Sequence, residues 1–177
     1  MNPRDIGHGA LENPYRRAVV RTTLFPEAVP EERYRYTFVL ALAWHLGWGT
    51  ALHLSQGAYA DTWGVASAVP QVQIATELGS HALLVGRYRF VGQTSASFYE
   101  PVYLARLPTM TGDARLGTLR EHAGALGARW TIIGDPGEAF SLTVFAEQEV
   151  SRLEYLRLLV NQVLIASVST IGVGSVF

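Results

Sequence analysis

The sequence predicts an all-β fold, an antiparallel up-and-down transmembrane β-barrel of about seven or eight strands, and three observations support it. Residues 33–46 alternate between large apolar side chains and small or polar ones, as in a strand whose two faces meet different environments. The chain is 49% hydrophobic and 16% charged, yet it has no apolar run of the roughly 18 residues that a transmembrane helix needs. Finally, the predicted connections alternate between short and long.

The apolar face of residues 33–46 has aromatic side chains at both ends and aliphatic side chains between them. It consists of Tyr34, Tyr36, Phe38, Leu40, Leu42 and Trp44. A membrane-spanning strand needs about 9–11 residues, with aromatic girdles at the two headgroup levels, and this face fits that length. A half-buried strand of a soluble barrel also alternates, so this strand alone leaves both interpretations open.

The other strands are predicted by the same alternation and by turn residues between them. We expect strands over about 50–59, 65–78, 82–93, 119–132 and 139–149, and a last strand ending at 177. In residues 151–166 the apolar side chains recur with a spacing that fits a helix as well as a strand, so this segment could form either. The whole chain, 1–177, forms one domain: barrel strands over 33–177 and an irregular segment 1–32, with a short strand at 15–23.

The lengths of the connections predict the orientation of the strands in a membrane. Connections at 47–49, 79–81 and 133–138 are short, whereas those at 22–32 and 94–117 are long. Outer-membrane barrels have short periplasmic turns and longer extracellular loops. The last residue, Phe177, resembles the terminal aromatic signal that the barrel assembly machinery reads. We therefore expect a bacterial outer-membrane location, with outer-membrane lipid and that machinery as partners.

Composition excludes several classes of protein and site. The net charge of −1 gives no indication of nucleic-acid binding. The absence of cysteine rules out disulfides and thiolate metal sites. The five histidines have no metal-ligand spacing, and there is no glycine-rich phosphate loop. We expect no metal and no cofactor. The histidines are His8, His45, His53, His81 and His122.

The start of the chain raises the question of completeness. Residues 1–10 have no apolar core of a secretory signal, which leads us to expect that a signal was removed or that the chain is part of a longer protein. Seven strands would leave an open edge, with unpaired backbone groups costing several kcal/mol each in lipid. The closure that this chain could make by itself pairs 15–23 with 171–177; otherwise it is a fragment of a larger barrel.

Charged residues at alternate strand positions are the candidate lumen residues. We expect three arginines to pair with three glutamates across the lumen, forming either a charged pore lining or a plug of ion pairs that fills a narrow barrel. The arginines are Arg87, Arg89 and Arg129, and the glutamates are Glu121, Glu147 and Glu149.

Two further groups of residues are candidate sites. His53 and Ser55 share a strand face and could form a base and a nucleophile, and with Gln56 they faintly resemble a pattern of outer-membrane lipid A deacylases; two polar lumen residues are the alternative. Aromatic residues of the predicted outer loops could bind a ligand or pack the loop on itself. These are Trp63, Phe98, Tyr99 and Tyr103.

Several short stretches together resemble a known family. They are residues 9–16, 30–36, 59–64, 87–90 and 96–99, and the final Phe177. In these the chain resembles the C-terminal part of a family of uncharacterised proteobacterial outer-membrane β-barrel proteins, known only as a domain of unknown function. Members are usually longer and carry a signal peptide. The resemblance implies a membrane barrel and brings no catalytic residues.

These observations predict a non-enzymatic outer-membrane protein, either a structural barrel or a narrow channel. One alternative is a soluble lipocalin-like barrel that binds a small ligand, in which the apolar face of residues 33–46 would pack inside. The other is an outer-membrane lipid hydrolase that uses His53 and Ser55.

Overall fold

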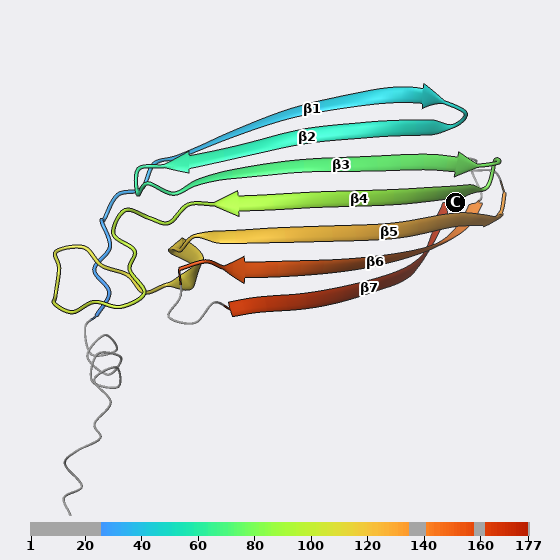
Figure 1. Cartoon of the computed structure of the whole chain (residues 1–177). Helices are drawn as coiled ribbons and strands as arrows, with labels where there is room; N and C mark the ends of the chain where they lie inside the picture. The colour runs from blue at the N-terminus through green and yellow to red at the C-terminus, as the bar shows by residue number, and fades with distance from the viewer. Residues whose placement is uncertain (1–25, 135–140, 158–161, 177) are drawn as a thin grey trace, which may run out of the picture.

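The chain folds into one antiparallel up-and-down sheet. The computed structural model describes residues 26–134, 141–157 and 162–176. Each strand pairs with the next one in the chain, in the order β1-β2-β3-β4-β5-β6-β7 (Figure 1). The strands are β1 (Arg35–Gly47), β2 (Thr50–Asp61), β3 (Ala66–Leu78), β4 (Ala82–Gln93), β5 (Leu119–Ile133), β6 (Ser141–Tyr155) and β7 (Gln162–Val176). The predicted all-β, up-and-down class is confirmed.

The helix considered for residues 151–166 is wrong over the residues that the structure describes there. Strand β6 continues to Tyr155, and β7 begins at Gln162, directly opposite it. Leu153 faces Leu164 across this hairpin, so the period-two pairing with β7 outweighs the helical spacing of the leucines. The only helical segment in the described residues is a single 3₁₀ turn, η1 (Ala114–Leu116).

The predicted closure into a barrel is not seen: in the described residues the sheet is open, and β1 and β7 are its edges. Seven antiparallel strands leave β1 and β7 running in the same direction, so these two edges cannot pair antiparallel with each other. Residues 15–23 and Phe177 lie outside the described residues, and with them the predicted pairing of 15–23 with 171–177.

The connections divide the molecule into a turn end and a loop end. At the turn end, β1 joins β2 through Trp48 and Gly49, and β3 joins β4 through residues 79–81. Positive φ angles at Gly47 (93°), Trp48 (50°) and Gly49 (69°) make the first turn tight. At the loop end lie the β2–β3 connection, the long β4–β5 connection and residues 26–34 (Figure 1). The predicted short turns at 47–49 and 79–81 lie at the end opposite the longest loop, whereas most of the turn predicted at 133–138 lies outside the described residues.

The strands are staggered relative to one another. Trp44, Leu52, Ile74, Gly86 and Leu126 form one row of paired residues across β1 to β5. Beyond this row, β1 continues for three residues to Gly47 and β3 for four residues to Leu78. Strand β5 continues for seven residues to Ile133. Such stepped ends are typical of the sheared, tilted strands of a barrel wall.

Candidate functional site: the two faces of the sheet and its loop end

The register gives the sheet one apolar and one polar face. Phe38 on β1 lies beside Ala58 on β2, and the row of Trp44 continues this face to Gln148 on β6 and Ser169 on β7. We call this the apolar face. Its large side chains include Tyr36, Phe38, Leu40, Leu42, Trp44, Leu54, Val72, Ile74, Leu84, Leu126, Trp130, Ile165, Ile171 and Val173. The opposite, polar face carries most of the charged strand residues.

The apolar face is the more exposed of the two. Leu126 is 75% exposed and Ile171 is 83% exposed. On the polar side of the same strand β5, Ala123, Ala125 and Thr131 are buried. On the central strands the polar-face side chains are therefore more enclosed than the apolar ones, whereas on the edge strands β1 and β7 both faces are exposed. This is the reverse of a soluble sheet protein, which buries its apolar face.

A charged cluster crosses the enclosed face at mid-height. Arg87 on β4 reaches over β5 to β6, where its Nη2 lies 2.6 Å from Glu147 Oε1 and 2.9 Å from Glu149 Oε2. The register places Ala125 and Gly127 on β5 between these partners. Because alanine and glycine are short, the long side chains can meet above them.

A second arginine extends the cluster toward the loop end. Arg89 donates from Nη2 to Glu121 Oε1 at 3.1 Å and lies 3.9 Å from Glu149. Its Nε is buried and has no hydrogen-bond partner among the described residues. Arg129 joins none of the ion pairs in the described residues, and its strand neighbours are Leu83 and Phe145. Five of the six predicted lumen charges therefore come together, and Arg129 stays apart.

His53 and Ser55 project from the polar face of β2. His53 lies between Ala43 and Gln73, and Ser55 lies between Ala41 and Gln71. Gln71 and Gln73 in turn adjoin Arg89 and Arg87 on β4. His53 and Ser55 therefore extend the row of polar side chains on this face from the charged cluster to β2. A catalytic base is usually oriented by a third group, often a carboxylate, and neither register neighbour of His53 is one.

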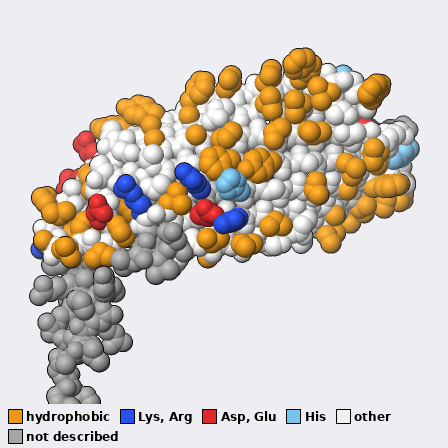
Figure 2. Space-filling model, viewed as in Figure 1, with side chains coloured by type: hydrophobic (Ala, Val, Ile, Leu, Met, Phe, Trp, Pro, Cys, Tyr) orange, Lys and Arg blue, Asp and Glu red, His pale blue; other side chains and the backbone are white. Residues whose placement is uncertain are grey.

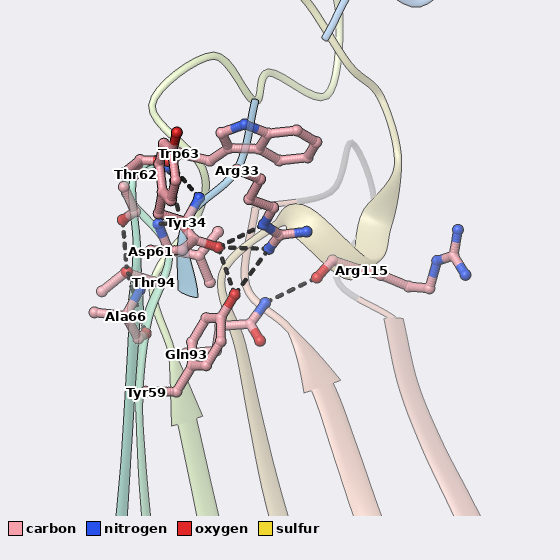
Figure 3. A network of polar contacts seen from close by, with 12 residues as sticks. Arg33, Tyr34, Tyr59, Asp61, Thr62, Trp63, Ala66, Gln93, Thr94 and Arg115 are labelled. Carbon is pink, nitrogen blue, oxygen red and sulfur yellow. Dashed lines mark hydrogen bonds and ion pairs between the residues drawn. The ribbon is translucent and has the colours of Figure 1, made fainter. Parts of the chain in front are cut away.

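The loop end holds a polar network that sequence reasoning missed (Figure 3). Its centre is Asp61, whose side chain is fully buried. Asp61 Oδ2 accepts from Arg33 Nε at 2.8 Å, from Arg33 Nη2 at 2.5 Å and from the Tyr59 hydroxyl at 2.6 Å. Its Oδ1 accepts from the backbone N–H groups of Trp63 and Val65 at 2.9 and 3.0 Å. Arg33 also lies over the Trp63 ring, 4.3 Å from its centroid.

These donors determine the charge state of Asp61, which ends β2 and lies among the loops. Burial acts to raise the pKa of its carboxyl, but hydrogen bonds from Tyr59, Arg33 and the Val65 amide outweigh burial and hold that pKa below its usual range. Asp61 is therefore a carboxylate that anchors the loop end, and not a proton donor.

The long β4–β5 loop packs on itself and on the neighbouring connections. Tyr99 and Tyr103 are buried, and the Trp63 and Phe98 rings meet edge to face at 5.3 Å. The Tyr103 hydroxyl donates to the Phe98 carbonyl and accepts from the Thr111 amide at 3.0 Å. Of the two interpretations of these aromatic residues, packing of the loop on itself agrees with these contacts. The small core of the described residues thus lies at the loop end and not in the sheet.

Other kinds of site are not indicated in the described parts of the chain. Among these residues there is no group of three or more histidine and acidic side chains that could hold a metal ion. No helix formed by them is long and apolar enough to cross a membrane.

Comparison with known proteins identifies a family and gives no activity. A family model described as a protein of unknown function (DUF3570) matches residues 8–149. No curated protein and no solved structure matches the chain.

Proposed function

We propose that this chain, which belongs to the DUF3570 family of proteins of unknown function, forms part of the wall of a β-barrel in the bacterial outer membrane, with a structural or narrow-channel role. The observation that carries the proposal is the polarity of the sheet: large apolar side chains stand exposed along one face, and the charged side chains gather in the more enclosed middle of the other. A barrel in lipid needs this arrangement, with apolar residues outward and polar residues toward the lumen.

Hydrophobic energetics support a lipid-facing surface. Strand β1 alone exposes Tyr36, Phe38, Leu40, Leu42 and Trp44 by 55% or more. Removing a large apolar side chain from water contributes about 1.5–3 kcal/mol, so this strand would gain several kcal/mol on entering lipid. Soluble monomers rarely expose a continuous apolar surface of this kind.

The polar face supports a lumen. The charges of Arg87 and Arg89 nearly cancel those of three glutamates, and this cluster lies midway along the strands. Charges at this depth facing lipid would be strongly unfavourable, whereas charges facing a water-filled or side-chain-filled interior are stabilised by their partners. A lipocalin-like ligand barrel would instead require an apolar interior, and the apolar face here points the other way.

Tryptophan fluorescence tests the proposal directly. Trp44 and Trp130 lie on the apolar face, whereas Trp63 packs against Arg33 and Phe98 at the loop end. Single-tryptophan variants would be reconstituted in vesicles whose phosphatidylcholine carries bromine near the headgroup end of the acyl chains, the depth of an aromatic girdle. We expect strong quenching of Trp44 and Trp130 and weak quenching of Trp63. Equal, weak quenching of all three would contradict a membrane-facing sheet.

A further inference from the structure

One small group of residues breaks the uniformity of the apolar face. In the described strands, three charged side chains lie on the apolar face: Arg120 on β5, and Arg152 and Glu154 on β6. The other charged residues of these strands lie on the polar face. His122 adjoins Arg152 across the strands, and Arg120 adjoins Glu154. We call these four residues the basic patch. Figure 2 shows such a gathering of charged and histidine side chains among hydrophobic ones.

The basic patch lies close to the loop end. Arg120 is the second residue of β5, and Glu154 is the last but one of β6. In a membrane this position corresponds to the headgroup level, the only depth at which an outward arginine is tolerated at low cost.

The patch carries more positive than negative charge. Arg152 pairs with Glu154 at 2.5 Å but remains 59% exposed. Arg120 is exposed and forms no ion pair within the described part of the chain. The two guanidinium groups therefore supply more donors than Glu154 can accept.

The surroundings of the patch suit a lipid and not only its headgroup. The Tyr88 hydroxyl lies 2.7 Å from His122 Nδ1, and the Phe90 ring packs 4.9 Å from the His122 ring. On the far side, the register places Val163 and Ile165 beside Glu154 and Arg152. Polar donors thus adjoin an aromatic and aliphatic surface that could contact acyl chains.

We propose that the basic patch binds the phosphate of an anionic lipid headgroup in the leaflet at the loop end. Arginine forms paired, charge-assisted hydrogen bonds to phosphate, and basic surfaces at membrane interfaces attract anionic lipids. The inference rests on the proposed membrane location and adds a lipid class to it.

The test uses the full chain in phosphatidylcholine vesicles with and without phosphatidic acid, whose headgroup is a phosphate monoester. Mass spectrometry would measure how much phosphatidic acid stays bound after extraction into detergent. The wild-type chain should retain it in preference to phosphatidylcholine, and inorganic phosphate should not displace it. The R120Q/R152Q variant should lose at least about tenfold in affinity, the equivalent of 1.4 kcal/mol. The E154Q variant should bind more tightly.

A matched control removes two positive charges elsewhere. Arg35 lies on the polar face and Arg106 in the long loop, so R35Q/R106Q should retain the lipid as the wild type does. Equal retention by R120Q/R152Q, no preference in the wild type, or a loss in E154Q would each overturn the inference. If Trp44 is quenched by brominated lipid but no preference for phosphatidic acid appears, the lipid site alone is wrong and the membrane location stands.

Discussion

Arg33 and Asp61 hold the start of β1 to the end of β2 through two hydrogen bonds that meet on one carboxylate oxygen, at 2.8 and 2.5 Å. The residues are 28 positions apart in the sequence. Asp61 also accepts from the amides of the β2–β3 turn, so one buried carboxylate fixes both the entry of the chain into the sheet and the shape of that turn.

Removing the charge of Asp61 should therefore destabilise the loop end. In D61N, an amide replaces a carboxylate that accepts five hydrogen bonds, and we expect a loss of about 3 kcal/mol in the free energy of unfolding. Urea unfolding of the reconstituted chain, followed by fluorescence, measures the loss. D113N is the control: its partner Arg115 is largely solvent-exposed, and the expected loss stays below about 1 kcal/mol.

The same carboxylate predicts a dependence on pH. Because the folded pKa of Asp61 is below the unfolded value of about 3.9, its contribution to stability is complete above that value and is lost as the pH falls through the folded pKa. A variant with Trp63 as its single tryptophan should report the opening of the loop end in an acid titration. The same titration in D61N should lack this component; an identical acid transition in both would contradict the assignment to Asp61.

The ion pairs of Arg87 predict an effect on selectivity if the assembled barrel conducts. In R87Q, Glu147 and Glu149 lose their shared partner, and the enclosed face becomes more negative by one charge. We expect the reversal potential in a KCl gradient across a planar bilayer to shift toward that of K⁺. R106Q makes the same charge change in the loop and should leave the potential unchanged. A shift of equal size in both variants would mean that Arg87 does not face the permeation path.

Two glycines of β7 offer a matched pair for testing packing on the polar face. Gly172 lies opposite Phe145, and a Cβ there would collide with the Phe145 ring, whereas a Cβ at Gly174 meets nothing within 4 Å. We expect G172A to cost about 1–3 kcal/mol of stability because the ring must move, and G174A to stay within about 0.5 kcal/mol of the wild type. Equal effects in thermal unfolding would show that the ring moves away freely.

Alternation was sufficient to predict most of the sheet. The predicted strand at 82–93 coincides with β4, and the two faces of residues 33–46 lie on opposite sides of β1. It left 151–166 open between helix and strand, because leucines at helical spacing coincide there with pairing to β7 that no local pattern reveals.

The sites were only partly predictable for a similar reason. The charges at every second position of β4 and of β6 identified the cluster around Arg87, since alternate residues of a strand lie on the same face. The Arg33–Asp61 contact joins residues far apart in sequence and depends on the turn geometry at Asp61. The basic patch depends on the register between β5 and β6, which a single strand does not disclose.

Two neighbouring residues of β1 provide the most direct test of which face meets lipid. Leu42 lies on the apolar face opposite Leu54, and Ala43 lies on the polar face opposite His53. In lipid, arginine at position 42 would stand in the hydrocarbon layer, next to the Trp44 girdle, and cost up to about 2–4 kcal/mol, whereas at position 43 its guanidinium would reach the polar interior. We therefore expect L42R to insert poorly into phosphatidylcholine vesicles and A43R to insert nearly as well as the wild type, as measured by the protease-resistant fraction. If the exposed apolar face of this edge strand met water instead of lipid, L42R would be harmless or would improve solubility. An L42R variant that folds normally in water and is at least as soluble as the wild type would contradict the membrane proposal.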